Sequence, residues 1–260
     1  MNQILKRLLT VCIAFSCLTA AVSGQTRSKT AIKRVVTKPG AAKKVETIIA
    51  PGEPWKQLNT KERLVEISTD FGVMIAKLYD STPLHRDNFV KLVEQKFYDS
   101  LLFHRVISQF MIQGGDPTSK TAAEDVPLGS GAIKGDRIPA EFKPYLFHKK
   151  GALAAARDDN PAKASSNCQF YIVQGKTLGQ QELDNVYTQR VKPSNASFTY
   201  TPRQKEVYAR IGGTPFLDQS YTVFGEVISG LDVIDKIASV PKGGGDRPLQ
   251  NVRMKIRLLN

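Results

Sequence analysis

Short apolar stretches recur along the chain from about residue 61 onwards, and most of them are bounded by turn residues. Apolar positions at 64–67 and 73–78 flank a polar turn that contains Gly72, whose residue type tolerates unusual backbone angles. This pattern predicts two antiparallel strands joined as a hairpin. Further strands are predicted within 103–116, as a second hairpin that turns at Ser108 and Gln109, and at 151–157, 169–173, 221–227 and 252–258.

The apolar spacing changes to the helical period in three places. Thr82-Pro83 supplies a helix cap and a first helical residue ahead of an apolar stripe at 89–93. Two more helices are predicted at 201–211, ended by a glycine pair, and at 231–238. Residues 176–213 interrupt the rhythm of strands and are interpreted as an insertion with helical content. Together the elements predict a mainly β protein, an antiparallel barrel capped by helices.

A glycine-rich stretch follows the second hairpin. Residues 118–136 are rich in Gly, Pro, Ser and Ala, which predicts a long surface loop. Gly129-Ser130-Gly131 within it could suggest a phosphate-binding loop, which should join a strand to a helix. The following stretch, 138–147, has two prolines and no helical stripe. We therefore do not expect a phosphate site there.

The N-terminal segment has the pattern of an export signal. Lys6 and Arg7 precede an apolar run at 8–18, and small residues follow it up to Gly24. We predict a signal peptide at 1–24, cleaved after Gly24. Two alternatives stay open: lipidation at Cys17, after a loosely lipoprotein-like sequence, and an uncleaved anchor, for which the run is short. The protein is expected to be exported, to the periplasm or the medium.

Charge and cysteine content fit this interpretation. Residues 25–60 are basic, with few large apolar side chains, and predict a flexible linker that could contact anionic surfaces weakly, ahead of a globular domain at 61–260. The formal net charge of +13 raises the question of nucleic acid, but export and the lack of interleaved aromatic residues argue against that partner. Two of the three cysteines lie in the signal segment, so no disulfide framework is expected.

The chemistry-bearing residues of the second hairpin suggest a binding surface. In extended strands, Arg105 and Gln113 can share a face with Phe110 and Met111 while their neighbours point into a core. They offer a planar guanidinium with several N–H donors, an amide and an apolar surface, but no nucleophile or general base. The three histidines, His85, His104 and His148, have no ligand spacing, so we assign them structural roles and expect no metal.

Three separated segments then carry a family resemblance. The segments are 103–116, Gln169-Phe170-Tyr171, and Phe216-Leu217-Asp218 followed by 223–225. Their order and spacing resemble those of a cyclophilin-type peptidyl-prolyl cis-trans isomerase. The resemblance covers most of 63–258. It implies a closed eight-stranded antiparallel β-barrel capped by two α-helices, no cofactor, and a proline-binding groove outside the barrel.

Matched position by position, the resemblance implies that Arg105 is the catalytic arginine and Gln113 its polar companion. Substrate-binding roles are implied for Phe110, Met111, Ala156, Arg157, Gln169, Tyr171, Phe216, Leu217 and Tyr221. Phe216 stands where many members have a tryptophan that donates to the drug cyclosporin, so tight binding of that drug is not expected.

The implied activity needs no proton transfer. An X-Pro peptide bond exchanges over tens to hundreds of seconds, and a cation that favours the twisted bond would accelerate this exchange. The expected partners are proline-containing polypeptides of exported proteins, and a monomer is expected. The alternative is a binding or chaperone module on the same barrel, with incidental turnover.

Overall fold

The computed structural model of the chain describes residues 62–124 and 126–260. The predicted signal peptide at 1–24 and the linker at 25–60 lie outside these residues. Among the helices that are described, none has the length and apolar character needed to cross a membrane.

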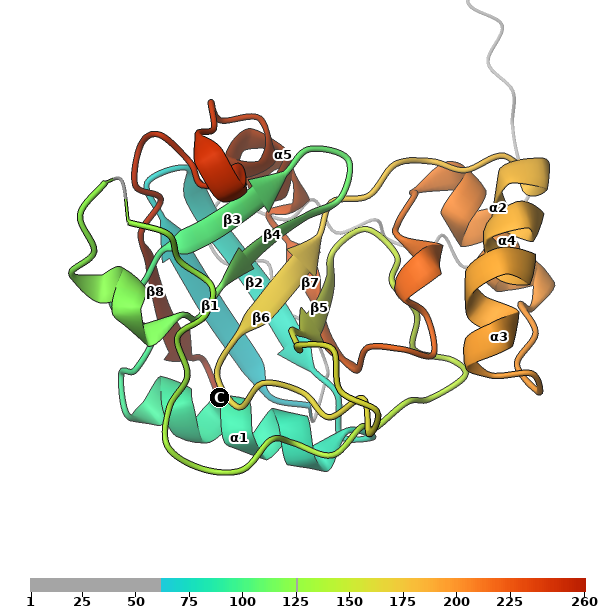
Figure 1. Cartoon of the computed structure of the whole chain (residues 1–260), viewed down its shortest axis with the longest axis horizontal. Coiled ribbons are helices and arrows are strands. Elements are labelled where there is room, and N and C mark those ends of the chain that lie inside the picture. The colour runs from blue at the N-terminus through green and yellow to red at the C-terminus, as the bar shows by residue number, and fades with distance from the viewer. Residues whose placement is uncertain (1–61, 125) are drawn as a thin grey trace, which may run out of the picture. The chain divides into compact units, whose positions relative to one another are not determined.

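Eight strands form one antiparallel sheet (Figure 1), in the order β3-β4-β6-β5-β7-β2-β1-β8. Hairpins join β1 to β2 and β3 to β4, as the sequence predicts, and Gly72 has a φ of +130° at the first turn. The strands are β1 Leu64–Thr69, β2 Gly72–Leu78, β3 Phe103–Ile107, β4 Met111–Gly114, β5 Ala152–Ala155, β6 Phe170–Val173, β7 Val223–Ser229 and β8 Met254–Leu258.

The two ends of this strand order come together only locally. An isolated bridge pairs Leu102 with Arg253, and the amide of Phe103 donates to the carbonyl of Val252 at 2.9 Å. No ladder between β3 and β8 accompanies these bonds in the described part of the chain. The eight antiparallel strands are therefore confirmed, whereas full closure of the barrel is not.

Both faces of the central strands are covered by apolar side chains. On β5, Leu153 and Ala155 belong to the inner core, while Ala152 and Ala154 belong to a second cluster on the outer face. β6 alternates in the same way, since Phe170 points inward and Tyr171 outward. This double burial explains why these strands read as continuous apolar runs. The outer cluster is where the candidate site lies.

Two helices pack at opposite ends of the sheet (Figure 1), as the sequence predicts. These are α1 Pro83–Glu94, which buries Phe89, Leu92 and Val93, and α5 Leu231–Ala238, which buries Val233, Ile234 and Ile237. The predicted side-chain cap at Thr82 is wrong, because the Thr82 hydroxyl donates to the carbonyl of Tyr79 instead. The carboxylate of Glu141, distant in sequence, accepts from the amides of Leu84 and His85 at 3.2 and 3.0 Å.

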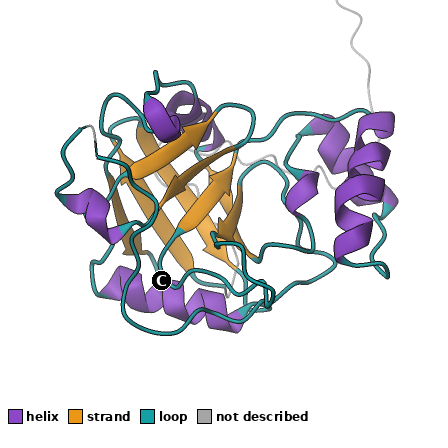
Figure 2. Ribbon diagram, in the orientation of Figure 1, coloured by secondary structure: helices purple, strands orange, loops and turns teal. Residues whose placement is uncertain are grey.

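The insertion forms its own group of helices beside the sheet (Figure 2). It contains α2 Gln180–Val186, the π-helical turn η3 Tyr187–Val191, α3 Lys192–Ser194 and α4 Pro202–Arg210. α4 begins with a capping box between Thr201 and Gln204. A separate small core holds these helices together, made of Leu178, Leu183, Val191, Phe198, Tyr200 and Tyr208.

Short 3-10 turns complete the described elements: η2 Pro117–Lys120, η4 Pro215–Leu217 and η5 Gly244–Asp246. η4 directly follows the insertion and leads back towards β7. It therefore connects the small helical core to the outer face of the sheet.

Candidate active site

The β3–β4 hairpin brings Arg105 and Gln113 together. They are direct partners in the strand register, on the face opposite the buried Val106 and Ile112. Gln109 lies in the turn of the hairpin and has a φ of +61°, a backbone angle that is uncommon for residues other than glycine. The Arg105 side chain is 41% exposed, and its Nε lies 3.7 Å from Oδ2 of Asp246 in η5. A half-exposed ion pair of this kind is weak, so the guanidinium remains available to a ligand.

These two residues open onto a small cavity of about 100 Å³ on the outer face of the sheet. Its walls combine apolar and polar side chains and come from β3, β4, β6 and η4, and from residues that follow β5 or precede β7. The lining residues are Arg105, Phe110, Met111, Gln113, Ala156, Arg157, Tyr171, Leu217 and Tyr221. Every residue that the sequence predicts for the site lines this cavity, except Gln169 and Phe216.

Those two residues lie beside the cavity. The Phe216 ring packs against the Phe110 ring with 5.4 Å between centroids and is 43% exposed, so it forms a rim. Gln169 accepts from Nε2 of Gln113 at 3.1 Å and donates to the carbonyls of Gly129 and Gly131. Gln169 thus holds Gln113 in place from behind the cavity wall.

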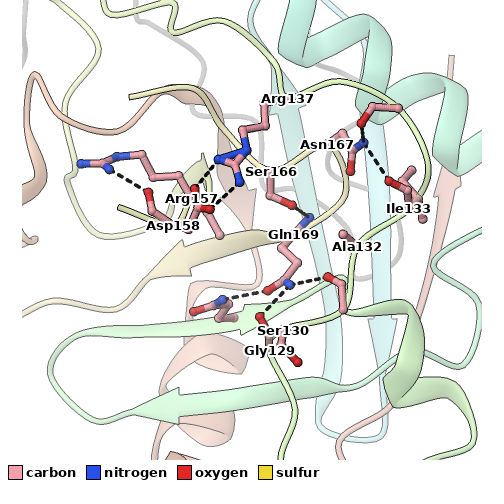
Figure 3. Close-up of a pocket in the computed structure, with 14 residues that line it drawn as sticks. Gly129, Ser130, Ala132, Ile133, Arg137, Arg157, Asp158, Ser166, Asn167 and Gln169 are labelled. Atoms are coloured by element: carbon pink, nitrogen blue, oxygen red, sulfur yellow. Dashed lines mark hydrogen bonds and ion pairs between the residues drawn. The ribbon is translucent and has the colours of Figure 1, made fainter. Parts of the chain in front are cut away.

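A larger cavity of about 540 Å³ adjoins the first one. The two share Gln113, Ala156 and Arg157, and the glycine-rich loop forms the far side of the larger one (Figure 3). Figure 3 shows the Gln169 amide reaching that loop and Arg137 paired with Asp158. An extended peptide that crosses the shared wall would contact both cavities.

The carboxylate of Asp116 shapes the glycine-rich loop. It accepts from the amides of Gly129 and Gly131 at 2.5 and 3.2 Å. Burial opposes its ionisation, but hydrogen bonds, led by that from the Thr118 side chain, outweigh burial and hold the pKa of Asp116 below its ordinary value. The loop is therefore a fixed wall, tied to the end of β4.

Arg157 is held over the far side of the small cavity. Its Nε donates to the carbonyl of Ser220 at 3.0 Å, and its Nη1 donates to the carbonyl of Asp158 at 2.9 Å. The guanidinium carbon lies 4.5 Å from the centre of the Tyr221 ring, a cation–π contact. Arg105 and Arg157 thus place a guanidinium on each of two sides of the cavity.

Comparison with known proteins identifies this arrangement. The family model of the cyclophilin type peptidyl-prolyl cis-trans isomerase/CLD matches residues 64–257. This chain belongs to that family. A protein of Staphylococcus epidermidis and one of Staphylococcus aureus are 34% and 35% identical over 198 residues, 76% of this chain and 91% of theirs. Both carry the name "Putative peptidyl-prolyl cis-trans isomerase".

Solved structures share the fold of this cyclophilin. A cyclophilin type peptidyl-prolyl cis-trans isomerase from Cryptosporidium parvum has a TM-score of 0.55 at 23% identity, covering 76% of this chain and 98% of that one. A second structure of the same protein, obtained in the presence of the dipeptide Ala-Pro, also has a TM-score of 0.55, at 22% identity and with coverages of 76% and 99%.

The titratable residues near the cyclophilin site include a buried histidine and a buried thiol. His104 is buried, neither ring nitrogen has a hydrogen-bond partner, and burial lowers its pKa to about 4. Burial likewise raises the pKa of the Cys168 thiol, which keeps it protonated. Across residues 62–124 and 126–260, no cluster of three His, Cys, Asp or Glu side chains could hold a metal ion.

Two further features of the site escape prediction from the sequence. Asp246, the partner of Arg105, lies in a glycine-rich 3-10 turn that has no apolar pattern. Asp218 and His148 are buried against Tyr171, whose hydroxyl lies 3.0 Å from Nε2 of His148. The adjacency of Asp218 to Leu217 was the only signal for the second feature.

Proposed function

We propose that this cyclophilin catalyses cis–trans rotation about X-Pro peptide bonds, with Arg105 as the catalytic residue. The observation that carries the proposal is the position of Arg105 opposite Gln113, at the mouth of a cavity of about 100 Å³ that Phe110, Met111 and Leu217 line with apolar side chains. A proline ring is small, apolar and lacks an N–H donor, so it fits such a cavity without leaving a polar group unpaired.

Rotation is slow because the peptide nitrogen shares its lone pair with the carbonyl, which gives a barrier of about 18–20 kcal/mol. In the twisted transition state the lone pair is localised on nitrogen. A guanidinium can donate to that lone pair and to the proline carbonyl, and its five donors in a fixed fork suit two acceptors at once. This stabilises the twisted bond more than either planar isomer, which is the requirement for catalysis.

The remaining residues serve binding and orientation. Met111, Leu217 and the Tyr171 ring hold the proline, while Gln113, fixed by Gln169, orients the chain beside it. The Cryptosporidium protein that was crystallised in the presence of Ala-Pro supports a proline peptide as the ligand of this fold. Proline-containing polypeptides are therefore the proposed substrates.

An exchange assay on a proline peptide tests the proposal. The full chain should accelerate cis–trans exchange, and Arg105→Ala should reduce the catalysed rate by about a hundredfold or more, the loss typical of a group that stabilises charge in a transition state. Arg210→Ala is the matched control, because Arg210 also forms an exposed ion pair, at 3.0 Å from Glu206, on the insertion. Equal rates for wild type and Arg105→Ala would contradict the proposal.

We also propose that the barrel closes fully, since backbone bonds already join residues 101–103 to 252–254. For the whole protein we propose an exported monomer whose signal peptide at 1–24 is removed and whose basic linker at 25–60 contacts anionic surfaces weakly. The basic start and apolar run of the sequence support export. Mass spectrometry of the mature N-terminus distinguishes Gln25 from a lipidated Cys17 and from the uncleaved chain.

A further inference from the structure

A buried polar cluster lies directly behind the wall of the small cavity. Asp218 and His148 are each 1% exposed, and Asp218 follows Leu217, a lining residue of the cavity. Oδ1 of Asp218 accepts from Nδ1 of His148 at 2.7 Å and from the His148 backbone amide at 2.8 Å. The carboxylate thus fixes both the backbone and the ring of His148.

The ring of His148 in turn positions the side chain of Tyr171. In the tautomer that donates from Nδ1 to Asp218, Nε2 can accept a hydrogen bond, and the Tyr171 hydroxyl lies 3.0 Å from it as the donor. The two rings also stack, with centroids 6.0 Å apart and an angle of 12°. Tyr171 in turn meets Tyr221 edge to face, with 6.1 Å between ring centroids, so the contacts extend along the cavity wall.

The insertion supplies the other half of the cluster. The hydroxyls of Tyr200 and Tyr208 both donate to Oδ2 of Asp218 at 2.6 Å. Burial, and after it the charge of Asp218, raises the pKa of both tyrosines well above the ordinary value, so they keep their protons and remain donors. A buried carboxylate is stable only when donors surround it, and Asp218 has four.

We propose that Asp218, His148, Tyr200 and Tyr208 form a positioning network that holds Tyr171 and Leu217 at the spacing which proline binding needs. The helical insertion thereby acquires a role, because it supplies the two hydroxyls that complete the network. The inference rests on the proposed isomerase function. None of the four residues lines the cavity, so they act through the wall and not on the reacting bond.

This location predicts a particular kinetic effect. A loosened wall weakens proline binding in the planar and twisted states alike, which raises KM and leaves kcat nearly unchanged. Loss of Arg105, in contrast, removes an interaction made in the twisted state and lowers kcat. A purely structural role for the network would lower stability without raising the KM of the molecules that remain folded.

The test removes hydroxyl groups and keeps the rings. In the full chain, the double variant Tyr200→Phe/Tyr208→Phe should raise KM for a proline peptide about three- to tenfold, with kcat within about twofold, because it weakens binding of the planar and twisted states equally. Tyr187→Phe is the matched control, since Tyr187 belongs to the same helical core but its hydroxyl donates to the carbonyl of Phe198 at 2.8 Å. Its KM should not change.

A double-mutant cycle tests whether the tyrosines of the insertion affect KM through Tyr171. Tyr171→Phe cuts the bond to His148, so the tyrosine changes in the insertion should add less to KM in that background than in the wild type. An unchanged KM in the folded double variant, or an equal rise in Tyr187→Phe, would overturn the network. If the double variant does not fold, Tyr208→Phe alone gives the same readout.

A failure of the network proposal can be distinguished from a failure of the proposed isomerase function. If wild type does not accelerate exchange, the isomerase proposal fails. The dissociation constant of the same peptide then tests the network proposal independently of catalysis. Weaker peptide binding in the double variant than in Tyr187→Phe would support the network, and equal binding would contradict it.

Discussion

At the scale of single residues, the site combines one half-exposed cation with neighbours that hydrogen bonds hold in place. Arg105 is half-exposed and weakly paired with Asp246, whereas Gln113 is held by Gln169, which is itself bonded to the carbonyls of Gly129 and Gly131. Arg157 is fixed by backbone carbonyls and a ring. Fixed walls favour catalysis because they hold the substrate in one geometry beside the guanidinium.

His104 predicts a pH dependence of stability. Its folded-state pKa of about 4 lies below the ordinary 6.5. Above pH 6.5 both states are neutral, but as the pH falls towards 4 only the unfolded chain binds the proton, so stability falls by about 3 kcal/mol in total from this group. Urea unfolding from pH 7 to pH 4 measures it. His104→Leu should flatten the slope in this window, and an unchanged slope would contradict the assignment.

The sequence predicts most of the site at this scale because the site is built on strands. Alternation along β3 and β4 places Arg105, Met111 and Gln113 on one face, and the order of the three motifs supplies Tyr171 and Leu217. The partners Asp246 and Asp218 depend on how distant turns fold back, and local periodicity does not contain that information.

At the scale of elements, α1 is stabilised by a side chain that sequence proximity does not reveal. The carboxylate of Glu141 accepts from the amides of Leu84 and His85 and from Nδ1 of His85 at 2.7 Å. Glu141 therefore caps the helix, a role expected of the residue before the first helical residue. Thr82 and Pro83 correctly mark the start of the helix, but the cap itself comes from the segment that follows the glycine-rich loop.

Replacing Glu141 should therefore destabilise the fold. Glu141→Ala leaves two helix amides and the buried His85 ring without their acceptor, so we expect the free energy of unfolding to fall by about 2–3 kcal/mol. Thr82→Val, which removes only a hydroxyl bonded at 3.3 Å, should cost about 1 kcal/mol or less. Denaturant unfolding measures both, and a larger loss in Thr82→Val would show that the cap is misassigned.

The insertion shows where element prediction fails. α4 follows from its cap, its proline and the glycine pair at its end. α2 and η3 have only four apolar positions, Leu183, Val186, Tyr187 and Val191, among polar residues, and neither a proline nor a side-chain cap marks where they begin. Their core is completed by Phe198, Tyr200 and Tyr208, from outside those elements, and only the folded chain brings these together.

At the scale of the whole molecule, the described residues contain every predicted part of the site and nearly coincide with the family match at 64–257. The mainly β class, the antiparallel sheet and its two helices are predictable from the pattern of apolar residues. Full closure of the barrel stays a prediction, because only a few backbone bonds between 101–103 and 252–254 join the two ends of the strand order.

Removal of the basic linker tests the domain boundary. A chain that lacks residues 1–60 should keep kcat and KM within about twofold of the chain that lacks only the signal peptide, because the lining residues all lie beyond residue 100. Binding to vesicles of anionic lipid should fall in the truncated chain, since most of the excess positive charge near the N-terminus is then lost. An inactive truncated chain would place the boundary earlier.

The central claim is that the forked guanidinium of Arg105 stabilises the twisted X-Pro bond. The most direct measurement is NMR exchange of a proline peptide with wild type, Arg105→Lys and Arg105→Ala, with the peptide dissociation constant determined for each. We predict unchanged peptide binding within about threefold and a kcat that falls in Arg105→Lys and further, by about a hundredfold or more, in Arg105→Ala. A kcat that is the same in all three proteins would contradict the account.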